Sequence, residues 1–263
     1  NDAGEIDPTN QSSLTGAEQL QHADAMVMSL RFRTWPDAER KYFTDAISRG
    51  VPIIGLRTST HAFQGPLKKF GKDVLGEEWV SHWGKHKVEA TRGVIEPTAV
   101  NHPILRDVTD VFGTSDVYEA YPPEDADILM RGVVLASLER DAKPAAYEKK
   151  RNRGDKQSQG INDPAMPIVW TREHEHESGS TSRIVCTTMG AATDLLDEGL
   201  RRLVVNSVFW GLKLDVPAAA NVALVDPYHP TAYGFDIYRT GTTAADHALG
   251  KGLAEVAEPV EAE

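Results

Sequence analysis

Two short apolar runs separated by one amphipathic segment constrain the fold of this chain most strongly. Residues 23–30 (ADAMVMSL) and 51–56 (VPIIGL) have the length and composition of buried strands, and residues 37–48 place apolar side chains at helical spacing. Gly50 stands where a helix commonly ends. Strand, helix and strand with short connections predict a βαβ unit, whose two strands are parallel and covered by helices.

Later apolar runs continue this α/β pattern. Further strands are predicted at 128–137, 167–171 and 183–189. A short helix is expected at 67–75, and Asp194 is placed to cap a long helix that runs to Leu212 with a wide apolar face. These elements are enough for one large domain, which we place at residues 1–214.

The polar segments are expected to lie in solvent. Residues 139–162 are almost entirely polar and predict a solvated loop that includes the basic residues 149–153. His174 and His176 fall in another polar stretch that reads as a loop. Residues 215–263 form a C-terminal arm whose aromatic part, 221–238, is expected to be ordered, and whose acidic end is expected to fray.

Composition excludes several classes of function. The net charge of −11 and the pI near 5.3 oppose binding to a nucleic acid backbone. Because no run of about 18 apolar residues occurs, no membrane-spanning helix is predicted, and the sequence shows no signal peptide. Cys186 is the only cysteine, so neither an intrachain disulfide nor a thiolate metal cluster can form.

Cationic side chains follow the two strands of the predicted βαβ unit. Arg31 and Arg33 come after the first strand, and Arg57 and His61 come after the second. Ligands of parallel sheets bind beyond the carboxyl ends of the strands, so these groups predict a local pocket for carboxylate, phosphate or vicinal hydroxyls. The alternative is that the arginines pair with structural carboxylates, for which Asp24 and Glu119 are candidates.

The turn RTSTH, residues 57–61, carries hydroxyl groups directly after the buried strand PIIGL. Thr58 is expected to face a ligand together with Arg57 and His61. The alternative is that the hydroxyls cap the next segment. Ser59 is a weak candidate nucleophile, because the turn lacks the G-x-S-x-G pattern of α/β-hydrolases.

Aromatic and imidazole side chains concentrate in residues 79–86 (WVSHWGKH), a combination suited to a sugar or a planar ligand. His82 and His86 are four residues apart, which suits a metal only on a helix. Gly84 argues against a helix there, so no metal site is assigned. Further along, Asp116 and Glu119 flank Tyr118 and are the carboxylates expected near the pocket, with potential for acid or base catalysis.

These segments together resemble the ThuA-like (trehalose utilisation) domains of the class I glutamine amidotransferase-like superfamily, in the form found in planctomycetes. The resemblance covers nearly the whole chain. It rests on 4–8 (GEIDP), 30–33 (LRFR), 52–63 (PIIGLRTSTHAF), 70–86, 102–105 (HPIL), 116–119 (DVYE), 162–171, 187–212 and 230–235 (PTAYGF). It implies an α/β, flavodoxin-like three-layer fold with a parallel sheet flanked by helices.

The resemblance also implies which chemistry is absent. Arg57 stands where the superfamily has its cysteine nucleophile, and Gly190 and Ala191 stand near the place of its histidine. We therefore expect no glutamine amidotransferase activity. The family's first βα unit, which precedes residues 4–8, is missing, and the chain begins at Asn1, so we expect a truncated or processed fragment.

The leading hypothesis is a protein of carbohydrate utilisation that binds a sugar or sugar-derived ligand, acting as a hydrolase or isomerase if it is catalytic. The expected catalytic residues are His61, His82 and Glu119. The expected ligand-binding residues are Arg31, Arg33, Arg57, Thr58, Trp83, His86 and Tyr118. No cofactor or metal, nucleic acid or membrane partner is expected. The alternative is a non-catalytic binding or assembly module that forms a homo-oligomer through the C-terminal arm. The resemblance also suggests that the protein is exported.

Overall fold

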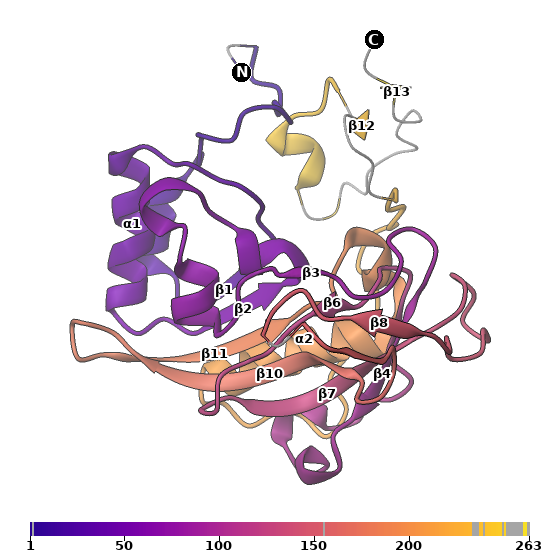
Figure 1. The fold of residues 1–263 in the computed structure, drawn as a ribbon. Helices are drawn as coiled ribbons and strands as arrows, with labels where there is room; N and C mark the ends of the chain where they lie inside the picture. The colour runs from indigo at the N-terminus through magenta and orange to yellow at the C-terminus, as the bar shows by residue number, and fades with distance from the viewer. Residues whose placement is uncertain are drawn as a thin grey trace.

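A mixed seven-stranded sheet forms the centre of the fold (Figure 1). The structure, a computed structural model, describes residues 1, 3–154, 156–232, 237–238, 240–248, 250 and 260–261. In spatial order the strands are β1 (Met26–Met28), β2 (Ile53–Leu56), β11 (Thr181–Thr187), β10 (Met166–Glu175), β7 (Asp127–Val134), β4 (Thr91–Ile95) and β5 (Phe112–Gly113). The strands predicted from apolar runs are therefore all members of one sheet.

The parallel part of the sheet contains the predicted βαβ unit. Strands β1 and β2 pair in parallel with Met26 opposite Ile53, and β2 pairs in parallel with β11 with Ile53 opposite Ile184. Helix α1 (Asp37–Ser48) connects β1 to β2. Every residue of β2 is buried, as predicted for the strand PIIGL. The other strands, from β11 through β10, β7 and β4 to β5, pair antiparallel.

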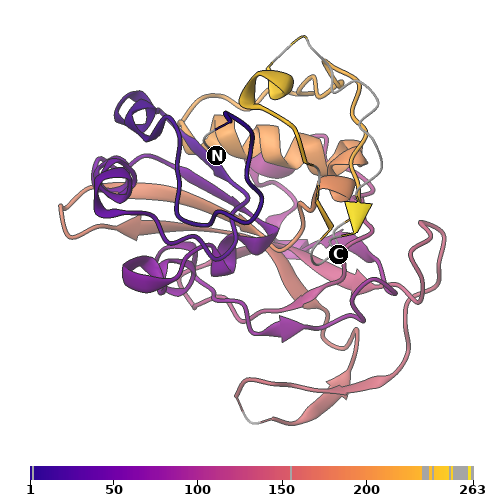
Figure 2. The same ribbon diagram turned by 90° about the horizontal axis from the view of Figure 1, so that it is seen from above.

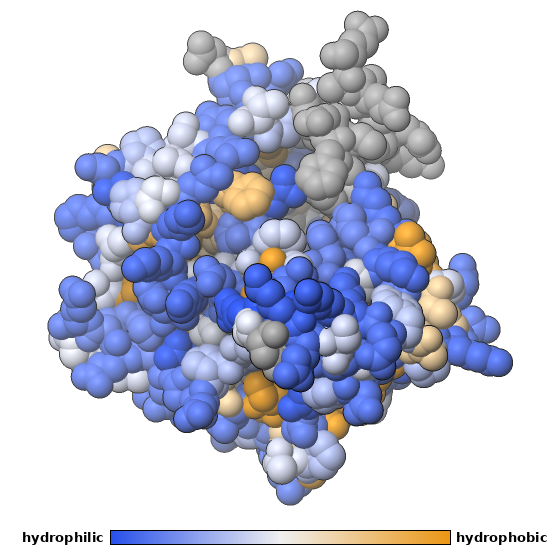
Figure 3. Space-filling model, in the orientation of Figure 1, coloured by the Kyte–Doolittle hydropathy of each residue, from blue (hydrophilic) through white to orange (hydrophobic). Residues whose placement is uncertain are grey.

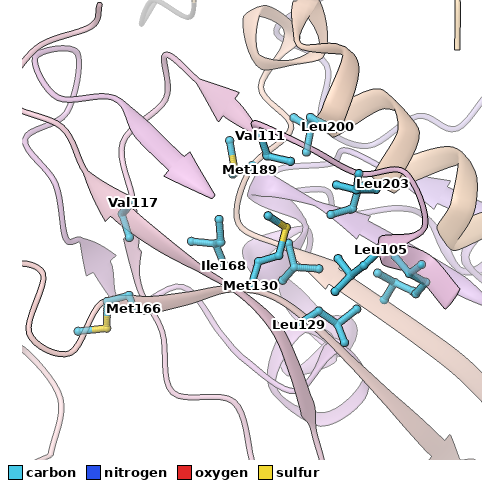
Figure 4. Packing of buried hydrophobic residues seen from close by; sticks show 14 of the residues in the cluster. Leu105, Val111, Val117, Leu129, Met130, Met166, Ile168, Met189, Leu200 and Leu203 are labelled. Atoms are coloured by element: carbon cyan, nitrogen blue, oxygen red, sulfur yellow. The ribbon is translucent and has the colours of Figure 1, made fainter. Parts of the chain in front are cut away.

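Alternation along the strands divides the core into two layers. Ile53 on β2 packs into a cluster with Phe43 of α1, whereas its neighbour Ile54 packs into a second cluster with Leu200 and Leu203 of α2 (Glu198–Gly211). Successive side chains of a strand point to opposite faces, so α1 and α2 cover opposite faces of the sheet. Figures 2 and 4 show α2 along the sheet and the side chains that pack beneath it. The α/β, flavodoxin-like class is confirmed, with a sheet that is mixed rather than wholly parallel.

The ends of the two α-helices follow local sequence signals. Helix α1 has the predicted bounds, and Gly50 follows it with a φ of 83°, a backbone conformation that glycine adopts without strain. The predicted cap of α2 was wrong. Asp197, rather than Asp194, caps the helix by accepting a hydrogen bond from the amide of Leu200. Asp194 instead belongs to a preceding 3-10 turn.

Short helical turns and small strand pairs complete the described chain. The 3-10 turns are Ala17–His22, Arg57–His61, Gly65–Leu67, Pro97–Ala99, Pro103–Leu105, Ala192–Leu196 and Ala244–His247, and Gly71–Leu75 is a π turn. Three short strand pairs are β3 (Ser81–His82) with β6 (Tyr118–Glu119), β8 (Glu148–Lys150) with β9 (Ser158–Gly160), and β12 (Ile237–Tyr238) with β13 (Val260–Glu261). In place of one helix at 67–75, the chain forms two separate turns, Gly65–Leu67 and Gly71–Leu75. Among the described helices, none has the length and apolar composition to cross a membrane.

Two segments predicted as polar loops are folded. Within 139–162, β8 and β9 form a hairpin, and Lys149 donates hydrogen bonds to the carbonyl oxygens of His82 and Trp83 at 2.8 and 2.7 Å. Arg153 pairs with Glu77 at 2.8 Å. The prediction of a solvated basic cluster was therefore wrong for Lys149 and Arg153, which have protein partners, whereas Lys150 is exposed. The second segment continues the β10–β11 pairing, in which His174 lies opposite Ser182.

The first part of the C-terminal arm packs on its own chain. Val216, Ala220 and Val222 are buried, and Arg201 of α2 donates a hydrogen bond of 2.9 Å to the carbonyl of Val222. Further along, the backbone of Thr243 forms an antiparallel bridge with Glu5, so the arm returns to the N-terminal segment. Residues 233–236, within the expected aromatic part, and residues 251–259, within the expected frayed end, lie outside the described residues.

Candidate functional site

Arg57 begins the turn after β2 with a backbone conformation that few residues adopt. Its φ is 42°, and its amide donates a hydrogen bond of 3.0 Å to the carbonyl of Met189, which follows β11. A non-glycine residue with positive φ marks a constrained turn and is common at functional sites. The turn therefore fixes where the side chain of Arg57 leaves the backbone.

The guanidinium of Arg57 is bound by the protein itself. Nη1 donates to the backbone carbonyls of Asp116 and Thr188 at 2.5 and 2.8 Å, and Nη2 donates to Oδ1 of Asp116 at 2.9 Å. The guanidinium carbon lies 3.8 Å from the ring centroid of Tyr118, within cation–π distance. Arg57 thus pairs with a structural carboxylate, as the alternative interpretation expected, but the partner is Asp116 and not Asp24 or Glu119.

Asp116 is a hub that also holds two imidazoles. His82 Nδ1 lies 2.7 Å from Oδ2, and His86 Nδ1 lies 2.8 Å from Oδ1. Burial raises the pKa of Asp116, but the hydrogen bond from His82 and the charge of Arg57 more than offset that effect and lower the pKa below its ordinary value. The carboxylate is consequently ionised at neutral pH.

A tight turn brings His82 and His86 together without a helix. His82 lies on β3 opposite Tyr118, and the amide of Gly84 donates to the carbonyl of Val117 at 3.0 Å. A Cβ on Gly84 would lie 3.3 Å from the Cβ of Asp116, so glycine lets the chain pass close to this residue before it turns to His86. The two imidazole centroids are 4.3 Å apart. The absence of a helix is as predicted, yet the two rings lie side by side.

A partly exposed aromatic cluster adjoins this network. The ring of Trp79, 38% exposed, lies 5.5 Å from the ring centroid of His61 and 5.6 Å from that of His82. Tyr118 lies within 6.3 Å of His61 and 5.5 Å of His82, and Phe32 completes the far side at 5.3 Å from His61. We call these five residues the aromatic cluster. Its members come from the chain after β1, the turn after β2, the segment just before β3, and the pair of β3 and β6.

The aromatic cluster is electrostatically neutral where it meets the arginines. The pKa of His61 is lowered from 6.5 to about 4, chiefly by burial and further by the nearby charges of Arg31 and Arg57. Its imidazole is therefore uncharged at neutral pH. Burial raises the pKa of Tyr118, whose hydroxyl is therefore protonated. A neutral imidazole presents one donor and one acceptor, a combination that matches a hydroxyl group.

Three of the predicted site residues lie elsewhere. Glu119 follows Tyr118 on β6, and its carboxylate accepts hydrogen bonds from Ser81 Oγ at 2.7 Å and from the amide of Asn152 at 2.8 Å. Trp83 is fully buried and donates to the carbonyl of Ile161. Arg33 donates to the carbonyl of Asn10 at 2.7 Å. Each of these side chains makes a structural contact away from the aromatic cluster.

Four other residues considered from the sequence lie at or near the turns after β1 and β2 or on β11. Arg31 lies 5.0 Å from the ring of Phe32, at the edge of the aromatic cluster. Thr58 is half-buried in the turn itself. Ser59 is fully buried and donates to the carbonyl of Met28 at 2.9 Å, which gives it a structural role rather than that of a nucleophile. Cys186 is fully buried on β11, and burial raises the pKa of its thiol.

Sequence reasoning overlooked Phe32 and Lys149 as parts of this site. Phe32 lies between Arg31 and Arg33 with a φ of 53°, so the turn after β1 is as constrained as the turn after β2. The run LRFR directly after a buried strand was the signal that could have identified it. Lys149 offers no comparable signal, because its contacts are backbone carbonyls from a distant segment.

Comparison with known proteins places the chain in a family. The model of the ThuA family, described as trehalose utilisation, matches residues 2–211. A solved ThuA-like protein from Bacteroides uniformis is 16% identical over 74% of this chain and 71% of its own, with a TM-score of 0.46. Another, from Parabacteroides merdae, is 14% identical over 86% of this chain and 82% of its own, with a TM-score of 0.49. No curated protein matches the chain. Because the family model spans most of the sequence, the chain belongs to the ThuA family.

Proposed function

We propose that this protein binds a sugar or sugar-derived ligand at the aromatic cluster and has no glutamine amidotransferase activity. The observation that carries the proposal is the position of the Trp79 ring, 5.5 Å from that of His61 and 5.6 Å from that of His82, beside the ends of β1 and β2. The carboxyl ends of parallel strands are the usual position of ligand sites in open α/β sheets. Membership of a family described by trehalose utilisation supports a carbohydrate as the ligand.

The chemistry of the cluster suits hydroxyl-rich ligands. Trp79 exposes part of a flat apolar ring on which the C–H face of a sugar can lie. His61 Nδ1 lies 3.3 Å from Thr60 Oγ1, so Nε2 is the nitrogen of this neutral imidazole that can bond to a sugar hydroxyl. His82 is 36% and His86 is 30% exposed at the side chain, so both imidazoles reach solvent beside that ring. The face of the molecule seen in Figure 3 is mainly hydrophilic, with small separate hydrophobic patches.

The assignment of roles differs from the expectation in two respects. Arg57 acts as a positioning residue for Asp116, because its side chain is only 6% exposed and its guanidinium donates to three protein acceptors. Glu119 is unsuited to proton transfer in this cluster, because its carboxylate is buried and bonded to the β8–β9 segment. Arg31, 5.0 Å from the ring of Phe32, is a cation at the edge of the cluster that an oxidised sugar can contact.

The absence of amidotransferase activity follows from the residues at the turn. A thiolate nucleophile needs an accessible cysteine with a low pKa, and Cys186 is fully buried with a raised pKa. The turn residue Arg57 carries no nucleophile. Incubation with glutamine should accordingly release no ammonia above a protein-free control.

A thermal-shift screen tests the proposal. The panel contains trehalose, other neutral sugars, keto-sugars and sugar acids, and a ligand present at 100 times its Kd should add roughly 2.7 kcal/mol to the free energy of unfolding. A shift that grows with ligand concentration for at least one sugar class supports the proposal. A cooperatively unfolding protein that shifts with none of the panel overturns it.

A further inference from the structure

The imidazoles of His82 and His86 and the carboxylate of Asp116 lie together as the donor set of a metal site. One ligand atom from each residue can be chosen so that all three atoms lie within 4.8 Å of one another. Two nitrogens and one carboxylate oxygen form a set that suits first-row divalent transition metals such as Zn²⁺, Co²⁺ or Fe²⁺. Among the described residues this is the group of three such side chains that meets the distance condition.

The three groups are held in position by the surrounding chain. Arg57 fixes Asp116 through both its backbone carbonyl and Oδ1, and Lys149 holds the carbonyl of His82 at 2.8 Å. The backbone amide of Gly84 bonds to Val117 between the two histidines. Ligands that are fixed before the ion arrives lose less conformational entropy on binding, which favours a specific site.

The partial exposure of the two imidazoles leaves a route from solvent to the three groups. The Asp116 side chain has no exposed surface, whereas the side chains of His82 and His86 are 36% and 30% exposed. The carboxylate is therefore the buried member of the set, and the two imidazoles are its solvent-exposed members. Metal sites with three protein ligands commonly bind a water or a substrate as the fourth ligand.

We propose that His82, His86 and Asp116 bind one divalent transition-metal ion through their imidazole nitrogens and one carboxylate oxygen. The nitrogens that lie 2.7 and 2.8 Å from the carboxylate bind as lone-pair donors once each neutral ring carries its proton on the other nitrogen. Asp116 Oδ2 faces the ion, and Oδ1 keeps its hydrogen bond from Arg57. The inference goes beyond the proposed sugar binding, and it is tested in the absence of any sugar.

The experiment is a titration of untagged, chelator-treated protein with Zn²⁺ by calorimetry and with Co²⁺ by visible absorption. We expect one ion per chain. His82→Gln and His86→Gln should each weaken the affinity by about 100-fold or more. Circular dichroism and thermal unfolding establish that both variants are folded.

The chain offers a matched control. His174 and His176 form a second histidine pair, with ring centroids 4.7 Å apart, but this pair belongs to no three-ligand set among the described residues. The double variant His174→Gln/His176→Gln should keep the wild-type affinity. Lack of ion uptake by the wild type, or uptake that survives both His82→Gln and His86→Gln, overturns the proposal.

A measurement on the wild type alone tests the site without depending on whether the variants fold. In ¹⁵N-labelled protein, Zn²⁺ should shift the imidazole signals of His82 and His86 and leave those of exposed His22 unchanged. Equal shifts at all histidines, or shifts confined to others, contradict the proposed site. A sugar screen with no hits would leave these titrations unaffected, so the two proposals fail separately.

Discussion

Arg57 Nη2 donates a hydrogen bond of 2.9 Å to Oδ1 of Asp116, across 59 residues of sequence. The side chains of the pair are 6% and 0% exposed. The bond joins the constrained turn after β2 to the carboxylate with which His82 and His86 are hydrogen-bonded. The turn after β2 therefore carries the cation that neutralises and orients a buried carboxylate.

Removing this cation should destabilise the fold. Arg57→Met leaves the carboxylate of Asp116 buried without its partner, and we expect the free energy of unfolding to fall by about 3–5 kcal/mol. Urea denaturation measures the change. In the double variant Arg57→Met/Asp116→Asn the loss should be smaller than the sum of the single losses, because the second substitution removes the unpaired charge. Additive losses would show that the two residues act independently.

His61 should make stability depend on pH below neutrality. Its pKa is about 4 in the fold, owing to burial and to the charges of Arg31, Arg57 and His82, against 6.5 when unfolded. Above about pH 6.5 both states are neutral and the residue contributes no pH dependence. As the pH falls from 6.5 toward 4, the unfolded state takes up the proton first, so stability is lost.

The control for this pH effect is a histidine variant on the surface. His61→Gln should flatten the decline of unfolding free energy between pH 6.5 and 4, whereas His22→Gln, which changes an exposed residue, should leave the decline as in the wild type. Parallel profiles for wild type and His61→Gln would refute the assignment.

Glu119 is predicted to be a structural anchor. Its carboxylate accepts the amide protons of Asn152 and Arg153 at 2.8 and 3.1 Å, together with the hydroxyl of Ser81. Glu119→Ala should therefore speed amide hydrogen exchange at 152 and 153 while sugar and metal affinities remain within about threefold of wild type, a change under 1 kcal/mol. Loss of sugar affinity without faster exchange would restore the catalytic role expected from the sequence.

The elements that sequence predicted well depend on local patterns. Helix α1 at 37–48 and the buried strand β2 were recognisable because their apolar spacing and the following Gly50 act within a few residues of one another. His61 follows the parallel strand β2, at the kind of position where ligand sites gather, but Tyr118 and His82 lie on the separate antiparallel pair of β6 and β3, so this rule did not predict that Tyr118 would lie beside both imidazoles.

The features that sequence could not predict depend on distant partners. The polarity of residues 139–162 predicts a segment exposed to solvent. Lys149 nevertheless donates hydrogen bonds to the carbonyls of His82 and Trp83, which lie 67 and 66 positions earlier in the sequence. Asp116 as the partner of Arg57 was equally invisible. Strand β6 is two residues long, too short for alternation to show that Tyr118 faces the aromatic cluster while Glu119 faces the hairpin.

The most direct test of the account is a calorimetric titration of the sugar with the largest thermal shift into wild type, Trp79→Ala and Tyr42→Ala. Trp79 is 38% exposed in the aromatic cluster, so its loss should weaken binding about tenfold or more with little change in stability. Tyr42 lies on α1 and serves as the aromatic control. The account predicts weaker binding in Trp79→Ala alone; equal binding by all three proteins would contradict it.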